Sequence, residues 1–326
     1  MRAATHTVVK SLAQIAGAVA LVLFAIWIAI AQPTFRGNRP SPVTADPVRL
    51  RSHVEALSQR FHPRDWAHTA NLAACADYVE AGLREAGAAV ASQEFSAAHR
   101  PYCNVIGRFA AGRGRKIVVG AHYDACGDTP GADDNASGVA ALLELARLLG
   151  AHPPDREVEL VAYCLEEPPF FRSAFMGSAI HAKNLARDKA GVRGVIVLEM
   201  VGFFSDEPGS QSYPSFLFRL LYPGRANFIG VVSRWDQGDW VKTVKTGMKG
   251  TTALPVCSIR APAVVPGIDF SDHLNYWPHG IPAVMVTDTS FYRNPAYHES
   301  GDTAERLDYR RMAQVVVAVF EAIRSI

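Results

Sequence analysis

Short runs of apolar, β-branched residues alternate along this chain with stretches whose apolar residues recur at helical spacing. The predicted buried strands are residues 116–120, 158–165, 195–198 and 283–287. Helical spacing is found in residues 71–86 and 135–149, and after Asp308. Strands that are apolar on both faces and alternate with helices are typical of a largely parallel sheet covered on both sides. The sequence therefore predicts an α/β fold.

Composition narrows the class of protein further. Hydrophobic residues make up 49% of the 326 residues and charged residues 20%, which excludes a disordered chain and allows one large core. The formal net charge of +2 argues against nucleic-acid binding, which requires a basic surface. Five cysteines are too few for a disulfide-based fold and cannot all pair. We therefore expect a compact globular body that does not bind nucleic acid.

The N-terminal segment predicts a membrane helix. No charged residue lies between Lys10 and Arg36, and residues 12–31 are almost wholly apolar, enough for a helix of about 30 Å that spans a bilayer core. Arg2 and Lys10 precede this stretch, which favours a cytoplasmic N-terminus. A cleaved signal is the alternative, because residues 29–31 resemble a cleavage site. We favour a retained anchor, and either case predicts a periplasmic or extracellular body, secreted if the segment is cleaved.

Three parts follow from this pattern. Residues 1–33 are predicted to be the membrane anchor or signal segment. Residues 34–47 contain several prolines and are predicted to be a stiff, extended linker. Residues 48–326 are predicted to form one catalytic domain.

Histidines and acidic residues follow the predicted strands where these end. They are His122 and Asp124 after the first strand, Glu166 and Glu167 after the second, Glu199 after the third and His298 after the fourth. Residues 131–135 add two carboxylates at the start of a helix, where helix capping would explain Asp133. In such sheets ligands bind beyond the carboxyl ends of the strands. Acidic groups gathered there would repel one another unless a cation neutralised them.

The types of ligand predict zinc. Two imidazoles with three carboxylates form a nitrogen and oxygen set that suits zinc. Five ligands are one more than a structural zinc takes, so we expect two ions that share one bridging carboxylate. Of the adjacent pair Glu166 and Glu167, one can bind metal while the other acts as a base. Asp124 lies on the same strand face as His122 and is placed to accept a hydrogen bond from its ring.

Six motifs in order resemble the zinc aminopeptidase family of co-catalytic di-zinc exopeptidases. They are His122-x-Asp124, GADDNASG at 131–138, AYCLEE at 162–167, LEM at 198–200, SDH at 271–273 and NPAYHESGDT at 294–303. The family includes secreted leucine aminopeptidases, glutamate carboxypeptidase and glutaminyl cyclase. The resemblance covers about residues 50–326 and implies a mixed sheet of about eight strands between helices.

The resemblance also implies a role for each matched residue. One zinc ion would be bound by His122 and Glu199 and the other by Glu167 and His298, with Asp134 bridging the two. Glu166 would be the general base that deprotonates a bridging water and returns the proton to the leaving amine, and Asp124 would orient His122. The implied activity is removal of N-terminal residues from peptides by a zinc-dependent aminopeptidase. One zinc ion in place of two is the alternative occupancy.

Two other functions remain open. Many aminopeptidases of this family have Asp where Glu199 stands, and Glu is found in the glutaminyl cyclases, so a single-zinc acyltransferase of that kind is the alternative. A non-catalytic ectodomain, as in the transferrin-receptor branch, is the third hypothesis, although no ligand is lost here. The preferred terminal residue, the choice between amino- and carboxypeptidase and the oligomeric state are not given by the sequence.

Several further residues have two interpretations each. His273 and Asp272 either contact the metal ligands or pack, and Tyr292 and Arg293 either polarise the scissile carbonyl or support the structure. A disulfide between Cys75 and Cys103 is a weak prediction in an oxidising compartment. Cys126 and Cys164 are interpreted as bystanders. Pro168 and Pro169 should stiffen the loop after the predicted base, and residues 203–270 should carry the specificity loops.

Overall fold

The computed structural model describes residues 2–35 and 37–326. Its centre is a mixed eight-stranded sheet with the order β1-β2-β4-β3-β5-β8-β6-β7. The strands are β1 (Ala89–Ala97), β2 (Arg100–Phe109), β3 (Lys116–His122), β4 (Val158–Tyr163), β5 (Val192–Glu199), β6 (Ile229–Arg234), β7 (Val256–Ala261) and β8 (Ala283–Thr287). The central neighbours β4, β3, β5 and β8 run parallel, whereas β1, β2 and β6 join by antiparallel pairing. The predicted mixed, largely parallel sheet of eight strands is confirmed.

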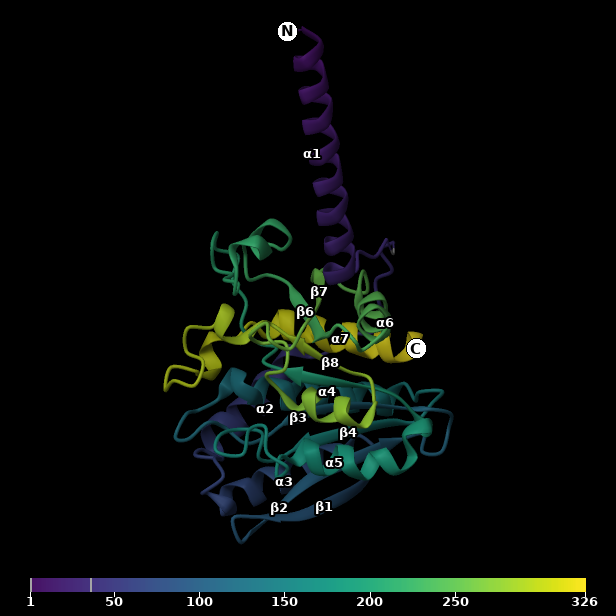
Figure 1. Cartoon of the computed structure of the whole chain (residues 1–326). Helices are drawn as coiled ribbons and strands as arrows, with labels where there is room; N and C mark the ends of the chain where they lie inside the picture. Colours follow the sequence, from purple (N-terminus) through teal and green to yellow (C-terminus); the bar gives the residue numbers. More distant parts are fainter. Residues whose placement is uncertain (1, 36) are drawn as a thin grey trace.

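Helices cover both faces of the sheet (Figure 1). They are α2 (Pro47–Glu55), α3 (Thr69–Glu85), α4 (Gly138–Ala151), α5 (Gly177–Leu185), α6 (Trp240–Met248) and α7 (Tyr309–Ser325). The larger core contains residues of α2, α3, α4, α6 and α7, and the smaller core lies under α5 and the short helix η5 (Asp272–His279). This arrangement confirms the predicted helical layers and leaves the carboxyl ends of the parallel strands free for a site.

The helix predicted from Asn135 begins three residues later, at Gly138. Residues Ala132–Ser137 form a separate turn, η2, in which Asp134 and Asn135 have non-helical backbone angles. The side chain of Asn135 still caps the helix, because its Oδ1 accepts a hydrogen bond from the amide of Gly138 at 3.0 Å. The turn therefore moves Asp134 out of the helix and toward the ends of the strands.

The N-terminal helix α1 (Arg2–Ala31) projects from the body (Figure 1). It contains a 22-residue stretch, Lys10–Ala31, that is long and apolar enough to cross a membrane. Its end is fixed to the body, because the carbonyl of Ala31 accepts hydrogen bonds from Lys245 and from Ser258, each at 2.8 Å. The predicted linker is also bound: the amides of Arg39 and Ser41 donate to the carbonyls of residues 250 and 251.

The predicted disulfide is wrong. Cys75 is buried on α3, whereas Cys103 is half-buried on β2, and both are free thiols. The sulfur of Cys103 lies 3.9 Å from the hydroxyl of Tyr123. The two cysteines therefore have separate environments, and the core does not depend on a covalent link between them.

Candidate metal centre

Three neighbouring parallel strands deliver the predicted ligands to one edge of the sheet. β3 ends at His122, β5 ends at Glu199, and the chain after β4 carries Glu166 and Glu167. β3 lies between β4 and β5, so their carboxyl ends are side by side. These four side chains are buried, and His298, from the loop after β8, closes the cluster with a side chain that is 27% exposed.

Asp134 lies between the two histidines. Its Oδ1 is 3.3 Å from Nε2 of His122, and its Oδ2 is 3.1 Å from Nε2 of His298. Oε2 of Glu199 lies 3.4 Å from Nε2 of His122 and completes the first group. Oε2 of Glu167 lies 3.2 Å from Nε2 of His298 and completes the second group. Ligands bound at about 2.0–2.1 Å to a tetrahedral zinc ion lie about 3.3 Å apart, so these separations suit two zinc positions that share Asp134.

The burial of the acidic groups supports a cation at this place. Burial raises the pKa of Glu166 well above its usual value, and the charges of Glu167 and Glu199 raise it further. Burial also raises the pKa of Glu167 to about 8, with Asp134 adding to the effect. Oε1 of Glu167 is buried and has no hydrogen-bond partner among the described residues. A divalent cation would supply the partner that these carboxylates lack, so the residues present fit zinc.

Asp124 contacts the histidine as predicted and also has a second role. Its Oδ1 lies 3.4 Å from Nδ1 of His122, and its carbonyl oxygen lies 3.2 Å from the same nitrogen. Its carboxylate accepts hydrogen bonds from the amides of Glu166 and Glu167, at 3.2 and 3.0 Å. One buried aspartate therefore fixes the ring and the adjacent carboxylate-bearing turn together.

Asp302 and Ser271 contact residues predicted to bind metal and were not singled out from the sequence. The carboxylate of Asp302 accepts hydrogen bonds from the amides of Asp133 and Asp134, at 3.0–3.1 Å. The hydroxyl of Ser271 donates to Oε2 of Glu199 at 2.7 Å. Both residues lie inside the quoted motifs NPAYHESGDT and SDH, which was the available signal.

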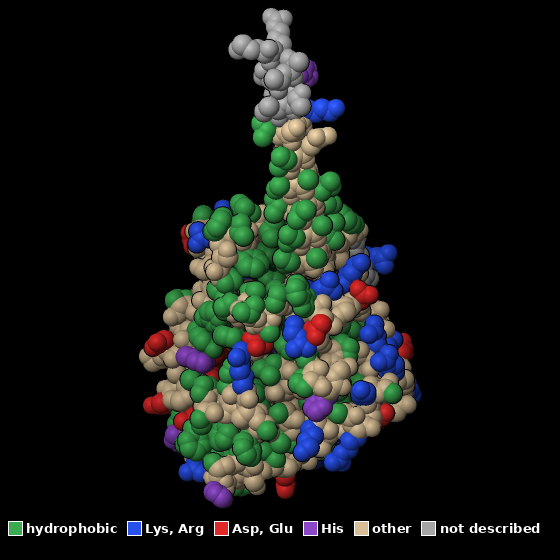
Figure 2. All heavy atoms as spheres, in the orientation of Figure 1, with side chains coloured by type: hydrophobic (Ala, Val, Ile, Leu, Met, Phe, Trp, Pro, Cys, Tyr) green, Lys and Arg blue, Asp and Glu red, His purple; other side chains and the backbone are tan. Residues whose placement is uncertain are grey.

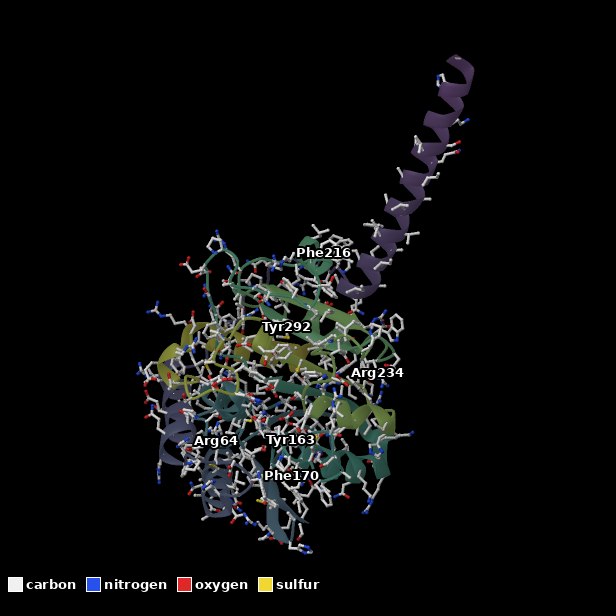
Figure 3. The ribbon with its side chains drawn as sticks, turned by 60° about the vertical axis from the view of Figure 1, so that its left-hand side comes forward. Arg64, Tyr163, Phe170, Phe216, Arg234 and Tyr292 are labelled. Carbon is white, nitrogen blue, oxygen red and sulfur yellow. The ribbon has the colours of Figure 1, made fainter. Side chains whose placement is uncertain are left out.

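Arg64 was missed altogether, and no pattern in the sequence marks it. Its guanidinium is fully buried and donates to the carbonyls of Tyr123 at 3.1 Å and Gly131 at 2.5 Å, as well as to those of Leu57 and Pro130. The carbonyls of Tyr123, Pro130 and Gly131 belong to the segments next to the predicted ligands His122 and Asp134. Arg64, labelled in Figure 3, therefore joins two loops of the site through its hydrogen bonds to Tyr123 and Gly131.

For Asp133 and Arg293 the structure decides between the two interpretations given above. Asp133 does not cap a helix: its carboxylate accepts from the amide of Gly202 at 2.9 Å and from the side chain of Asn294 at 3.0 Å. Arg293 is buried, donating to the carbonyl of Phe228 and lying 4.7 Å from its ring centroid, so it supports the structure.

In the SDH segment, Ser271 makes the hydrogen bond to a predicted ligand. Nε2 of His273 donates a hydrogen bond to the carbonyl of Ile268 at 2.8 Å, and the ring packs edge-on against Trp277. Asp272 is buried, and its carboxylate has no hydrogen-bond partner among the described residues. The sulfur of Cys126 lies within 4.8 Å of side-chain atoms of Glu167 and His298 that could bind a metal, so Cys126 is part of the site. Cys164 is buried in the core.

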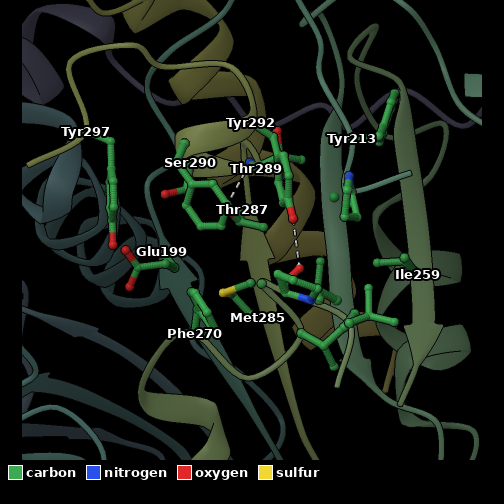
Figure 4. A pocket seen from close by; sticks show the side chains of 18 of the residues that line it. Glu199, Tyr213, Ile259, Phe270, Met285, Thr287, Thr289, Ser290, Tyr292 and Tyr297 are labelled. Carbon is green, nitrogen blue, oxygen red and sulfur yellow. Dashed lines mark hydrogen bonds between the residues drawn. The ribbon is translucent and has the colours of Figure 1, made fainter. Parts of the chain in front are cut away.

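A cavity of about 300 Å³ opens beside the predicted ligands. Figure 4 shows Glu199 and Tyr297 at one side of it and Tyr213 and Ile259 at the other. Its lining is largely aromatic and aliphatic, with Phe171, Phe218, Tyr222, Phe228, Val232, Val265, Phe270, Met285 and Phe291 among the residues. Among the described residues that line it there is no Lys or Arg, whereas four carboxylates lie at its inner end. The cavity therefore suits an apolar group, and its described lining offers no cationic side chain to a carboxylate.

Comparison with known proteins identifies the family. The sequence profile of peptidase family M28 matches residues 104–323. The uncharacterized protein YfbL of Escherichia coli K12 is 47% identical over 296 residues, which cover 88% of this chain and 91% of that protein. Aminopeptidase YwaD of Bacillus subtilis is 28% identical over 216 residues, covering 64% of this chain and 41% of that protein. This chain thus spans less than half of that aminopeptidase.

Solved structures share the fold. LapB from Legionella pneumophila superposes with a TM-score of 0.67 at 20% identity, covering 86% of this chain and 72% of that one. A glutaminyl cyclase from Bacteroides thetaiotaomicron gives a TM-score of 0.64 at 20% identity, covering 86% of this chain and 98% of the cyclase chain. The match to the family profile spans more than half of the chain and agrees with the resemblance of the motifs. The chain therefore belongs to peptidase family M28, a family of zinc-dependent peptidases.

Proposed function

We propose that this protein is an aminopeptidase that removes N-terminal residues with large apolar side chains. The observation that carries the proposal is the lining of the cavity, which combines aromatic and aliphatic walls with carboxylates at the inner end and lacks Lys or Arg among its described residues. A carboxypeptidase would need a cationic side chain for the substrate carboxylate, and the described lining of the cavity offers none. The cavity then receives the side chain of the first residue.

The residues of the centre divide the chemistry between them. Asp134, His122, Glu199, Glu167 and His298 would hold two zinc ions, which when bound supply Lewis-acid activation of water and of the peptide carbonyl. Glu166 accepts the proton of the attacking water and passes it to the nitrogen of the leaving amine. Asp124 keeps Glu166 in place through the backbone amide.

The test combines metal content with hydrolysis. We expect two zinc ions per chain in the wild type and in Glu166→Gln, with hydrolysis of leucyl and phenylalanyl anilides lost only in the variant. Glu94→Gln, at an exposed position on β1, is the matched control and should keep both properties. An N-acetylated anilide should not be cleaved, because it lacks the ammonium group. Cleavage of the blocked compound, or full activity of Glu166→Gln, would contradict the proposal.

A glutaminyl-cyclase-like transferase is the second candidate, and Glu199 favours it. The resemblance places Glu at this position in the cyclases, and Glu has one more methylene than the Asp found in many aminopeptidases. The same samples separate the two candidates. One zinc ion per chain, release of ammonia from N-terminal glutaminyl peptides and no anilide hydrolysis would support the cyclase.

We further propose that α1 is a retained membrane anchor and that the body lies outside the cytoplasm. Most of the large apolar side chains of α1 between Leu12 and Ile28 are exposed, as a membrane-spanning helix requires. Mass spectrometry of the protein purified from membranes tests the anchor. Detection of the intact N-terminal segment supports it, and a mature chain that begins near residue 32 would show a cleaved signal instead.

A further inference from the structure

The segment that contains the short helix η4 (Phe216–Leu220) exposes large apolar side chains. Phe216 is 73% exposed, Leu217 56% and Leu220 77%. Exposure of adjacent large apolar residues costs solubility and marks a surface that contacts something apolar. Arg219 and Arg225, also exposed, add positive charge to the same segment.

The opposite side of this segment lines the cavity. Tyr213, Phe218 and Tyr222 pack against one another with ring centroids 6.0–6.5 Å apart, and all three belong to the cavity wall. These inward aromatic residues account for the folding of the segment. The outward residues are not needed for it, so their exposure requires another explanation.

One residue of β7 connects the segment to the end of α1. The hydroxyl of Tyr222 donates to the carbonyl of Ser258 at 2.7 Å, and the hydroxyl of Ser258 donates to the carbonyl of Ala31 at 2.8 Å. Figures 1 and 3 show η4 and Phe216 at the end of the body from which α1 projects. Figure 2 shows hydrophobic side chains gathered at this end.

The length of α1 leaves no spacer between the body and a bilayer. The apolar stretch has 22 residues, or about 33 Å of helix, and a bilayer core is about 30 Å thick. Ala29 is still exposed, whereas Ala31 is already buried against the body. A bilayer that surrounds α1 would therefore meet the body where η4 lies.

We propose that residues 213–225 form a second membrane contact, in which Phe216, Leu217 and Leu220 enter the interfacial layer of a phospholipid bilayer. Arg219 and Arg225 would lie at the level of the phosphate groups. This inference rests on the proposed anchor. It also places one wall of the cavity directly against the lipid surface.

The experiment is photo-crosslinking of the full chain in nanodiscs that contain a phospholipid with a photoreactive group high on its acyl chain. Adducts are mapped by mass spectrometry. We expect adducts on α1 and on the peptide that contains residues 213–225. The double variant Leu217→Asp and Leu220→Asp should lose at least about nine-tenths of the second set and keep the first, because Asp is costly to place in the interface.

Two controls define the result. Val48→Asp alters an equally exposed apolar residue on α2, 72% exposed, and should leave both sets of adducts unchanged. Hydrolysis of a soluble anilide should be unchanged in the double variant, because residues 217 and 220 do not line the cavity. This second measurement shows that the variant is folded.

The outcomes separate the two proposals. Adducts on α1 with none on residues 213–225 would overturn the membrane contact and leave the anchor intact. Absence of the N-terminal peptide would overturn the anchor, and adducts on residues 213–225 would then support the contact by themselves. Dimers in the nanodiscs that the double variant loses, without lipid adducts on residues 213–225, would show that a second protein copy covers this surface and would also overturn the proposal.

Discussion

The hydroxyl of Ser271 donates a hydrogen bond to Oε2 of Glu199, with 2.7 Å between the two oxygen atoms. Both residues are buried, so the bond orients a carboxylate that has few other partners. We predict that Ser271→Ala lowers the affinity for one of two zinc ions by about 10- to 100-fold, because such supporting hydrogen bonds have effects of this size. Zinc titration followed by calorimetry measures it. Ser92→Ala, at an exposed hydroxyl on β1, is the control, and equal affinities in the two variants would refute the role.

Asp124 supports His122 and the amides of Glu166 and Glu167 at once. In Asp124→Asn the amide group keeps the size of the side chain but turns one acceptor oxygen into a donor. We predict that kcat falls by about 100-fold while KM changes little, since the positions of the base and the histidine change and the cavity does not. Steady-state kinetics with a leucyl anilide measures this split. A rise in KM alone would place Asp124 in substrate binding instead.

Ile259 lies on the cavity wall far from Glu199 (Figure 4). We predict that Ile259→Asp lowers kcat/KM for phenylalanyl anilide by about 100-fold, because a buried carboxylate replaces an apolar contact with the substrate side chain. The same change should raise kcat/KM for lysyl anilide relative to phenylalanyl anilide. Ile259→Leu keeps the apolar surface and should change both values little. An unchanged ratio in Ile259→Asp would mean that the side chain of the substrate binds elsewhere.

The lowered pKa of Glu159 predicts how the free energy of unfolding depends on pH. Burial alone would raise its pKa, but the hydrogen bond and charge of His181, together with Lys116 and Arg108, outweigh burial and lower the pKa from 4.5 to about 2. A lowered pKa contributes stability that is present above the unfolded value and is lost as the pH falls through the folded value. The wild type should therefore lose about 3 kcal/mol of this contribution between pH 4.5 and about 2.

Urea unfolding across this acid range measures the effect. In Glu159→Gln the group does not titrate, so its free energy of unfolding should fall less steeply than that of the wild type. Glu94→Gln, at an exposed position on β1, should follow the wild type. Parallel curves for Glu159→Gln and the wild type would show that the buried ion pairs do not contribute.

The central strands and the predicted ligands could be located from the sequence because their signals are local. Buried strands such as β3 and β5 are continuous apolar runs, and each ends directly at a predicted ligand, His122 or Glu199. The outer strands β1 and β7 are half-exposed and contain polar residues, so periodicity did not show them. Their place in a mixed sheet came only from the resemblance to a family.

The contacts that hold the ligands were harder to predict, since they join distant parts of the chain. Arg64 and Gly131 are 67 residues apart, and no local pattern marks a buried arginine whose partners are backbone carbonyls. The same reason explains the wrong interpretation of Asp133, whose partner amide at Gly202 lies 69 residues away. The sequence next to Asp133 favoured a helix cap. In the structure its carboxylate instead accepts a hydrogen bond from an amide that is distant in the sequence.

The bonds that fix residues 31–41 to the body also determine how the enzyme would meet its substrates. The carbonyl of Ala31 is held by Lys245 and Ser258, and the amides of Arg39 and Ser41 are bound as well. An enzyme on a free tether samples a hemisphere of solution above the membrane. With α1 in a bilayer as proposed, these bonds would hold the body at one height, and the body would meet membrane-bound substrates by lateral diffusion in two dimensions.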